Sequence, residues 1–406
     1  MNTCNICKKS TNLKNFIKFG KFPYANFPVD LKKFKKYIIK KKLTTELTGN
    51  LDLQSCSSCN YLQLEKIPNS NTLNDIYEKF YTYPSPLKYN FNPTRDSFFL
   101  KKLFTYLKNF NCKTILEIGC YDGYILKQLQ KKNYEVTGCE PSKGALIGKK
   151  FNINIINDFF NKKIFLNKKF DLIIMRHTLE HIPNLKKIMK DMIYVMHNES
   201  TLSIEVPNME FYVKQGLLEV FSLQHIHYFS IKTFEKLAMT YDLKILKTIK
   251  SPENIIIFFK KANSKKKKLN NNIKNKKNEK NEKNFSKFQS KIKKNQSKIE
   301  NIIKKFNTNK IIYWGAGGFA VAAMHLYKLP IKFDSLWVDK DISKHGLFFY
   351  KHNIKISPIM LKTIKQKKLI VITSYYSQQI INDIREMKIK INILQIFPKI
   401  KQINLI

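Results

Sequence analysis

Residues 113–124 read KTILEIGCYDGY. The stretch begins as a short apolar run of the kind that forms a buried parallel strand, and it ends in a turn that carries Gly119 and Gly123. The residues after the turn predict a helix, another turn and a second strand. The two glycines therefore lie where a first strand passes into a first helix, and open α/β sheets bind ligands at such a point.

Strand and helix patterns alternate from about Asp96 to Lys261. They predict helices at residues 97–110 and 124–131, strands at 113–119, 134–140, 170–175 and 202–206, and a closing antiparallel pair at 243–249 and 255–259. This order of elements predicts a doubly wound α/β sheet.

A second α/β unit begins at Lys310, where IIYWGAGGFAVAA predicts a strand, a glycine turn and a helix. The stretch before it is rich in Lys and Asn, and its first half is typical of a solvated linker or a very polar helix. In its second half, apolar residues recur at spacings near three and four and predict an amphipathic helix. These residues are Phe285, Phe288, Ile292, Ile299, Ile302, Ile303 and Phe306. We therefore expect four parts, at residues 1–68, 69–262, 263–308 and 309–406.

The chain has 406 residues, of which 43% are hydrophobic, and this is enough for two or three domains with buried cores. No run of about 18 apolar residues is present, and the N-terminal MNTCNICKK lacks the apolar centre of a signal peptide. These features predict a cytoplasmic protein that does not enter a membrane.

The net charge of +44 raises the question of nucleic-acid binding. Only Arg95, Arg176 and Arg385 are arginines, although bidentate contacts to phosphates and bases prefer arginine. Lysine spread along the chain, with much Asn and Ile, indicates an AT-rich coding bias instead. A nucleic-acid-binding protein that uses the N-terminal cysteines and the lysines of residues 265–283 remains an alternative.

Four of the seven cysteines form two C-x-x-C pairs, Cys4 with Cys7 and Cys56 with Cys59. The two-residue spacer lets both sulfurs of a pair face one ion, so we expect a structural zinc site. Four thiolates leave no open position for catalysis on that ion. The other cysteines, Cys112, Cys120 and Cys139, are expected to be small buried residues, since a disulfide framework is not expected in a cytoplasmic chain.

The first glycine loop does not have the G-x-G-x-x-G spacing, because Tyr121 stands where a second glycine would allow close approach of a pyrophosphate. The pattern is that of S-adenosylmethionine-dependent methyltransferases. Glu140, at the end of the next strand, is expected to accept from the ribose hydroxyls. Asp158 and Phe159 are expected beside the adenine. The full set of expected cofactor-binding residues is Glu117, Gly119, Cys120, Asp122, Gly123, Glu140, Pro141, Asp158, Phe159 and His177.

A second glycine loop, with Gly315, Gly317 and Ala320, comes nearer to the dinucleotide fingerprint, and Asp339 follows about one βα unit later. It favours a rival class, a nicotinamide-dependent sugar-nucleotide oxidoreductase or epimerase. The other interpretation, which we prefer, is a related sheet that keeps the tight turn and binds no dinucleotide.

The motifs occur in a recognisable order: paired C-x-x-C with FGKFPYANF between them, then EIGCYDG, CEPS, FDLIIMRHTLEHIPN, IEVPN, HIHYFS, WGAGGFA and VDKD. In this order the chain resembles the sugar C-methyltransferases of deoxysugar biosynthesis, over its whole length except the lysine-rich linker. The resemblance implies a zinc-binding N-terminal domain, a central class I methyltransferase domain and a C-terminal Rossmann-like domain. It also implies methyl transfer to carbon 3 of a nucleotide-linked 4-keto-6-deoxy sugar.

Forming an enolate beside a ketone needs a general base with a pKa near neutrality, and histidine suits that task. By analogy with the family we assign His225 as the base, with His181 and either Tyr81 or Tyr83 stabilising the enolate. His181 could instead be a helix-cap histidine, and we expect His177 and His227 to be orienting or surface residues.

The chain departs from the family at Gln224, where a glutamate is usual, and the amide cannot carry the charge that would raise the basicity of a neighbouring histidine. Another acceptor, including a sugar hydroxyl in an O-methylation, therefore stays open. The C-terminal loop also has Phe319 nearby where a lysine is common in the family. The sequence leaves the sugar, its nucleotide and the choice between monomer and homodimer undetermined.

Overall fold

The computed structural model describes residues 4–7, 13–24, 28–40, 48–59, 61–79, 85–251, 253–262, 278–331, 335–349 and 354–405. The chain divides into two compact units. The first unit consists of Met1–Phe16, Leu53–Met209 and Gln224–Asn278, and the second of Ile17–Asp52, Glu210–Leu223 and Glu279–Ile406. The chain thus passes between the units several times, and the division into four consecutive parts stays a prediction.

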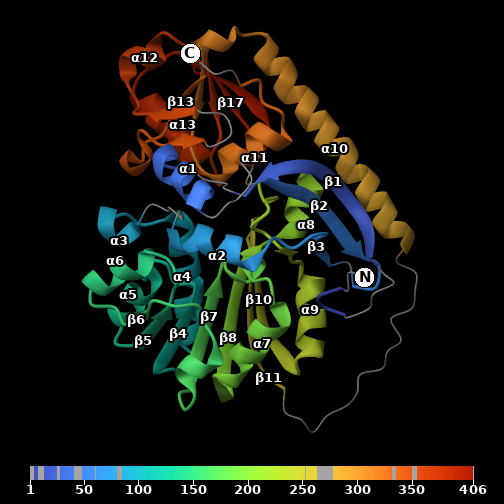
Figure 1. The fold of residues 1–406 in the computed structure, drawn as a ribbon, viewed down its shortest axis with the longest axis vertical. Coiled ribbons are helices and arrows are strands. Elements are labelled where there is room, and N and C mark those ends of the chain that lie inside the picture. Colours follow the sequence, from blue (N-terminus) through green and yellow to red (C-terminus); the bar gives the residue numbers. More distant parts are fainter. Residues whose placement is uncertain are drawn as a thin grey trace. The chain divides into compact units, whose positions relative to one another are not determined.

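The first unit contains a seven-stranded sheet in the order β10-β11-β8-β7-β4-β5-β6 (Figure 1). Its strands are β4 (Thr114–Ile118), β5 (Glu135–Cys139), β6 (Ile155–Ile156), β7 (Phe170–Arg176), β8 (Met196–Pro207), β10 (Leu243–Lys250) and β11 (Asn254–Lys261). The strands from β6 to β8 are parallel, and β11 and β10 continue the sheet antiparallel. The predicted doubly wound sheet and its closing antiparallel pair are confirmed.

Helices and shorter turns connect these strands. They are α4 (Thr94–Leu107), α5 (Tyr124–Gln130), α6 (Gly144–Lys150), α7 (Leu185–Tyr194), α9 (Ile231–Thr240), and the 3-10 turns η1 (Lys162–Phe165) and η2 (Leu179–His181). Among the described helices, none combines the length and apolar character that a membrane span requires.

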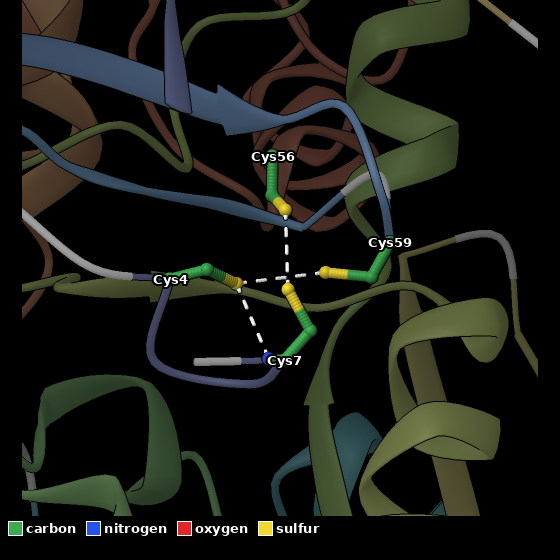
Figure 2. A group of neighbouring side chains, drawn as sticks. All are labelled: Cys4, Cys7, Cys56 and Cys59. Atoms are coloured by element: carbon green, nitrogen blue, oxygen red, sulfur yellow. Dashed lines mark hydrogen bonds between the residues drawn. The ribbon is translucent and has the colours of Figure 1, made fainter. Parts of the chain in front are cut away.

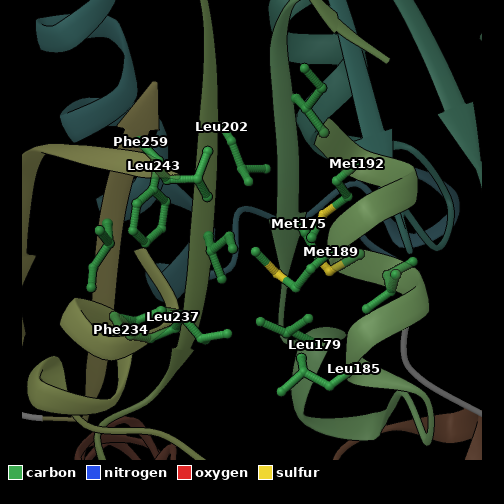
Figure 3. Packing of buried hydrophobic residues seen from close by; sticks show 14 of the residues in the cluster. Met175, Leu179, Leu185, Met189, Met192, Leu202, Phe234, Leu237, Leu243 and Phe259 are labelled. Atoms are coloured by element: carbon green, nitrogen blue, oxygen red, sulfur yellow. The ribbon is translucent and has the colours of Figure 1, made fainter. Parts of the chain in front are cut away.

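The sheet separates two apolar cores, because alternate residues of a strand point to opposite faces. Ile173 and Met175 of β7 pack into the core beneath α7 and α9, which Figure 3 shows with Met189 and Phe234. Leu172 and Ile174 of the same strand belong to the core that includes residues of α4 and α5. Burial on both faces explains why the strand reads as a continuous apolar run, FDLIIM.

The N-terminal strands β1 (Leu13–Pro23), β2 (Thr48–Cys56), β3 (Leu62–Leu64) and β9 (His227–Tyr228) form a four-stranded sheet in that order. In the first unit, β3 pairs antiparallel with residues 53–55 of β2 and with β9. Strand β3, which follows the second C-x-x-C pair, is therefore paired with His227 and Tyr228, two and three residues after the predicted base His225. Helices α2 (Ser70–Lys79) and α3 (Pro86–Tyr89) complete this unit.

The second unit contains another seven-stranded sheet, in the order β14-β15-β13-β12-β16-β17-β18. Its strands are β12 (Ile311–Trp314), β13 (Leu336–Val338), β14 (Phe348–Phe349), β15 (Ile354–Ser357), β16 (Leu369–Ile372), β17 (Ile391–Gln395) and β18 (Lys401–Leu405). Its helices are α1 (Leu31–Lys40), α10 (Asn278–Lys304), α11 (Gly318–Leu326), α12 (Leu361–Lys365), α13 (Ser377–Glu386) and, after Met209, most of α8 (Met209–Gln215). Helix α10 buries Phe288, Ile292, Ile299, Ile302 and Ile303. The side chain of Phe285 and residues 263–277 lie outside the described residues.

Asp171 ties together the starts of three central strands. Its carboxylate accepts from the backbone N of Lys113 at 2.8 Å and of Thr114 at 2.7 Å, and His197 lies 2.9 Å from its other oxygen. Although partial burial alone would raise the pKa of Asp171, these hydrogen bonds lower it to about 2. A carboxyl group whose pKa falls on folding stabilises the fold above its unfolded pKa and loses this effect as pH falls through the folded pKa.

We expect Asp171→Asn to lower the free energy of unfolding by about 2 kcal/mol at pH 7, since a depression of nearly two pKa units is worth about that much. The difference from wild type should narrow as pH falls from about 4 towards 2. Urea unfolding curves across this pH range measure it. Glu135→Gln is a matched control, because Glu135 is 54% exposed in its pair with Lys168, and the change should cost less than about 0.5 kcal/mol. An Asp171 effect that is equally large at every pH would contradict the assignment.

Candidate functional site

The loop between β4 and α5 needs glycine at two positions. Gly119 has φ +75°, and a Cβ there would lie 2.2 Å from Oγ1 of Thr178, in the loop after β7. Gly123 has φ +76° and would bring a Cβ to 3.0 Å from Ile153 and Ile155. The backbone therefore turns back at the carboxyl edge of the sheet with no room for side chains, and this is where a ligand meets a doubly wound sheet.

Glu140, at the end of β5, joins this loop to the next one. Its carboxylate is buried and accepts from the backbone N of Tyr121 at 3.0 Å and of Ser142 at 2.9 Å. A carboxylate has about four acceptor positions, so two remain for the hydroxyls of a ribose.

A cavity of about 290 Å³ opens beside Glu140. The residues that line it are Glu78, Pro141, Ser142, Lys143, Asn157, Asp158 and Phe159. The structure thus brings together Pro141, Asp158 and Phe159, three of the residues expected to bind the cofactor. The volume is at the lower end of the range for small-molecule sites.

Asp122 and Cys120 shape the loop through contacts with the protein. Asp122 is buried and accepts from Oγ of Ser85 at 2.6 Å and from the backbone N of Leu87 and Tyr124 at 3.0 Å, so it anchors the starts of α3 and α5. Burial raises the pKa of Asp122 and, far more, that of the Cys120 thiol. The backbone O of Cys120 accepts from the backbone N of Gly123 at 2.8 Å, so both predicted cofactor residues help to hold the loop in place.

Glu117 is buried in β4, two residues before Gly119. Burial raises its pKa to about 8, although Arg176 opposes the shift. Its Oε2 has no hydrogen-bond partner among the residues that the structure describes. A dry acidic group at this edge suits a cationic ligand group such as an ammonium, because binding of a cation would favour its charged form.

Arg176, at the end of β7, is a residue whose role sequence reasoning missed. Its Nε donates to Glu205 at 2.7 Å and its Nη2 to Asp96 at 2.9 Å, and its guanidinium lies 4.2 Å from the centre of the Phe99 ring. Burial alone would raise the pKa of Glu205, but Arg176 and His177 hold it at about 2. The available signal was an arginine at the end of a buried strand in a chain whose other cations are nearly all lysines.

His177 follows Arg176 and lies between two carboxylates. Its Nδ1 is 3.7 Å from Glu180, and its Nε2 is 3.7 Å from Glu205. His177 was expected among the cofactor residues, and the described contacts place it in this chain of charges, in agreement with an orienting role.

The structure brings His181, His225 and Gln224 together. The rings of His181 and His225 have centroids 4.7 Å apart, and Nδ1 of His181 lies 2.9 Å from the carbonyl oxygen of Gln224. Burial lowers the pKa of His181 and so favours its neutral form. Tyr77 of α2 lies at this cluster, with its hydroxyl 2.9 Å from Nδ1 of His181. Sequence reasoning missed it and named Tyr81 and Tyr83, which lie outside the described residues.

Glu180 is the third residue that sequence reasoning missed. It is 1% exposed, and neither carboxylate oxygen has a hydrogen-bond partner among the described residues. One ligand atom each from Glu180, His181 and His225 lie within 4.8 Å of one another. Burial alone would raise the pKa of Glu180, but His177, His181 and His225 together lower it to about 2.

His227 is a structural histidine. It is 1% exposed, its Nε2 lies 2.8 Å from the carbonyl oxygen of Ile182, and its Nδ1 is hydrogen-bonded to the hydroxyl of Tyr61. Of the two roles expected for it, the surface position is wrong, because both ring nitrogens make contacts inside the first unit.

The two C-x-x-C pairs come together, as Figure 2 shows. The four sulfur atoms of Cys4, Cys7, Cys56 and Cys59 all lie within 4.8 Å of one another, with 3.5 Å between Cys4 and Cys59 and between Cys7 and Cys56. No cysteine of the described residues forms a disulfide. Sulfurs at about this spacing fit a tetrahedral zinc ion with Zn–S bonds near 2.3 Å.

The Gly315 loop of the second unit is arranged like the Glu140 site. Asp339, at the end of β13, accepts from the backbone N of Ala316 at 2.7 Å, but Lys344 also lies 3.0 Å from the same oxygen. Its other oxygen accepts from the backbone N of Asp341. The carboxylate that would hold the ribose of a dinucleotide is therefore engaged with an ammonium and two amides of its own domain.

One family model and several solved structures are similar to part of this chain. The family model described as "Methyltransferase domain" matches residues 94–248. Among solved structures, an S-adenosylmethionine-dependent methyltransferase from Clostridium acetobutylicum is 14% identical, with a TM-score of 0.35 over 48% of this chain and 99% of that one. The plantazolicin methyltransferase BpumL, solved with SAH, is 19% identical, with a TM-score of 0.36 over 47% and 94%. No curated protein matches the chain.

The family match and the sheet order together identify the central part of the chain as a class I methyltransferase domain. The chain therefore carries a methyltransferase domain over residues 94–248.

We expect Gly119→Ala to weaken S-adenosylmethionine binding at least about tenfold, because the new Cβ collides with Thr178 at a left-handed φ and the loop must move. Isothermal titration measures the affinity. Gly317→Ala, in the other glycine loop, is the matched control, since a Cβ there meets no atom within 4 Å and its φ is −146°. Equal affinity in the two variants would show that the Gly119 loop does not hold the cofactor.

Proposed function

We propose that this enzyme methylates a nucleotide-activated keto-deoxysugar at a carbon beside the ketone, through an enolate formed by a histidine base. The observation that carries the proposal is the cluster of His181, His225 and Tyr77, which lies in the same unit as the methyltransferase sheet. The order of motifs along the chain supports the choice of a sugar acceptor.

The residues present fit the proposed methyl donor. We propose that Glu140 accepts from the ribose hydroxyls, that Asp158 and Phe159 contact the adenine, and that Glu117 faces the amino-acid part. S-adenosylmethionine supplies an electrophilic sulfonium methyl group. The loop at Gly119 contributes backbone and no side chain, so the ligand can approach the carboxyl edge closely.

At the acceptor side, His225 would remove the proton next to the carbonyl. The electron pair of that C–H bond becomes the enolate, whose carbon forms the new bond to the methyl group while the S–CH₃ bond breaks. The Tyr77 hydroxyl would donate a hydrogen bond to the enolate oxygen and stabilise its charge as it develops. His181, whose Nδ1 lies 2.9 Å from this hydroxyl, would position it. The proton stays on His225 until solvent removes it.

Gln224 is the residue that bears most directly on the choice between a carbon and a hydroxyl acceptor. Its side chain is buried, and the Tyr77 hydroxyl lies 3.4 Å from its Oε1. An amide adds no charge beside His225, whereas Glu180, on the neighbouring turn, does. Methylation of a sugar hydroxyl is therefore the second candidate, and it needs the same base but no enolate.

We also propose that Cys4, Cys7, Cys56 and Cys59 hold one structural zinc ion. Cys4 and Cys56 are buried, and the backbone N of Cys7 lies 3.5 Å from the sulfur of Cys4, a contact that stabilises a thiolate. The ion would tie the N-terminal turn to the strand that pairs with β9.

His225→Ala should reduce methyl transfer by about 10²- to 10⁴-fold and leave S-adenosylmethionine affinity nearly unchanged. Mass spectrometry of reactions with a panel of keto-sugar nucleotides detects the product by the gain of one methylene. His197→Gln is the control, since His197 lies at the amino end of the sheet beside Asp171. Without the methyl donor, wild-type enzyme in D₂O should exchange the sugar proton beside the ketone. Full turnover by the variant would exclude His225 as the base, and transfer without exchange would favour the hydroxyl acceptor.

Elemental analysis of the purified protein should find about one zinc ion per chain. The double variant Cys56→Ser/Cys59→Ser should lose the ion and unfold at lower temperature, because metal binding contributes to folding. Cys112→Ser should retain the zinc, since Cys112 is outside the four-sulfur cluster. Zinc-free wild-type protein of undiminished stability would refute this part of the proposal.

A further inference from the structure

Glu180 has a buried carboxylate that lacks hydrogen-bond donors among the described residues. Its side chain is 2% exposed, and Nδ1 of His177 is 3.7 Å from Oε1, beyond hydrogen-bond distance. No described residue makes a hydrogen bond to either oxygen. Burying a carboxylate in this way is costly unless a cation or several donors compensate it.

His181 is held in the form that a metal ligand needs. A carbonyl oxygen can only accept, so the 2.9 Å contact with Gln224 places the ring proton on Nδ1. The lone pair is then on Nε2. Histidines that bind metals almost always donate their other N–H to a carbonyl or carboxylate in this manner, because it fixes the tautomer and the ring orientation.

Glu180, His181 and His225 also have the right spacing. One ligand atom from each lies within 4.8 Å of the other two. Two ligands on opposite sides of an ion, each about 2.1 Å from it, are roughly 4.2 Å apart, so small side-chain movements suffice for all three to reach one ion.

We propose that Glu180, His181 and His225 form a binding site for a divalent first-row transition-metal ion, separate from the four-cysteine site. Two imidazoles and one carboxylate suit ions such as Mn²⁺, Fe²⁺, Co²⁺ or Zn²⁺. Three protein ligands leave coordination positions open. A hydroxyl oxygen of the acceptor can occupy one of them, where the ion would favour ionisation of that hydroxyl.

The proposed role of the open position rests on the proposed function, because it takes a sugar oxygen to lie at this cluster. The ion uses the lone pair of His225, so this histidine serves as a ligand in the metal-bound protein and as a base in the metal-free protein. Ion binding itself requires neither acceptor nor methyl donor, and it can be measured without activity.

The test uses the full chain, given one equivalent of Zn²⁺ so that the four thiolates, which favour zinc over manganese, are filled first. Titration with Mn²⁺ alone, followed by the electron paramagnetic resonance signal of the unbound ion, should then show about one Mn²⁺ bound per chain. Glu180→Gln and His225→Ala should each weaken this binding by about 10- to 100-fold or more. Glu135→Gln, an exposed carboxylate, is the matched control and should bind Mn²⁺ like wild type.

Retained S-adenosylmethionine affinity in both variants shows that they are folded. If wild type binds no Mn²⁺ at millimolar concentration, or if both folded variants bind it as wild type does, the inference is wrong. A wild type that methylates sugars but binds no Mn²⁺ overturns the metal site and leaves the proposed function intact. Mn²⁺ binding that depends on Glu180, without sugar methylation, supports the metal site and counts against the proposed acceptor.

Discussion

The carboxyl edge of the methyltransferase sheet depends on one buried guanidinium. Arg176 joins β7 to β8 through Glu205 and to α4 through Asp96. The side chains of Arg176 and Glu205 are more than nine-tenths buried, and that of Asp96 is 12% exposed. A buried cation is tolerated only when its charge is matched and its donors are used. Because the carboxylates of Glu205 and Asp96 both accept from the guanidinium of Arg176, they fix the position of the end of β7 and the start of the following loop.

From this guanidinium a line of alternating charges and imidazoles leads to the acceptor cluster. Glu205 faces His177, His177 faces Glu180, and Glu180 lies beside His181 and His225. In a low-dielectric interior each group influences the protonation of the next more strongly than it would in water. The loop that carries Thr178, which packs against Gly119, belongs to the same segment. Thr178 and the acceptor histidine His181 thus both lie in the short segment of residues 177–181 that follows β7.

The sequence was sufficient for the features that local patterns encode. KTILEIG and FDLIIM became β4 and β7 nearly as expected, and the two C-x-x-C pairs met as their spacing indicated. Contacts between residues far apart in the chain could not be predicted from the sequence. Arg176 and Asp96 are separated by 80 positions, and Tyr77 reaches His181 across 104. Periodicity shows which face of an element is apolar, but it does not show which polar groups two distant elements bring together.

The environment of Glu180 could not be predicted from the sequence either, although the neighbouring residue is a predicted site residue. Glu180 adjoins His181 in the sequence, but its burial and its lack of described partners depend on the packing of the whole edge. Gln224 was recognised as a departure from the expected glutamate, and only the three-dimensional arrangement shows that a carboxylate from another segment stands close to the same histidines.

The pairing of β3 with β9 has a consequence for the order in which the chain can fold. Leu62 pairs with Tyr228, so this edge of the N-terminal sheet cannot close until about 166 further residues have left the ribosome. The four cysteines, by contrast, have all been synthesised by residue 59. A zinc ion bound early would keep the two turns together through that interval and present a prepared edge to the last strand when it arrives.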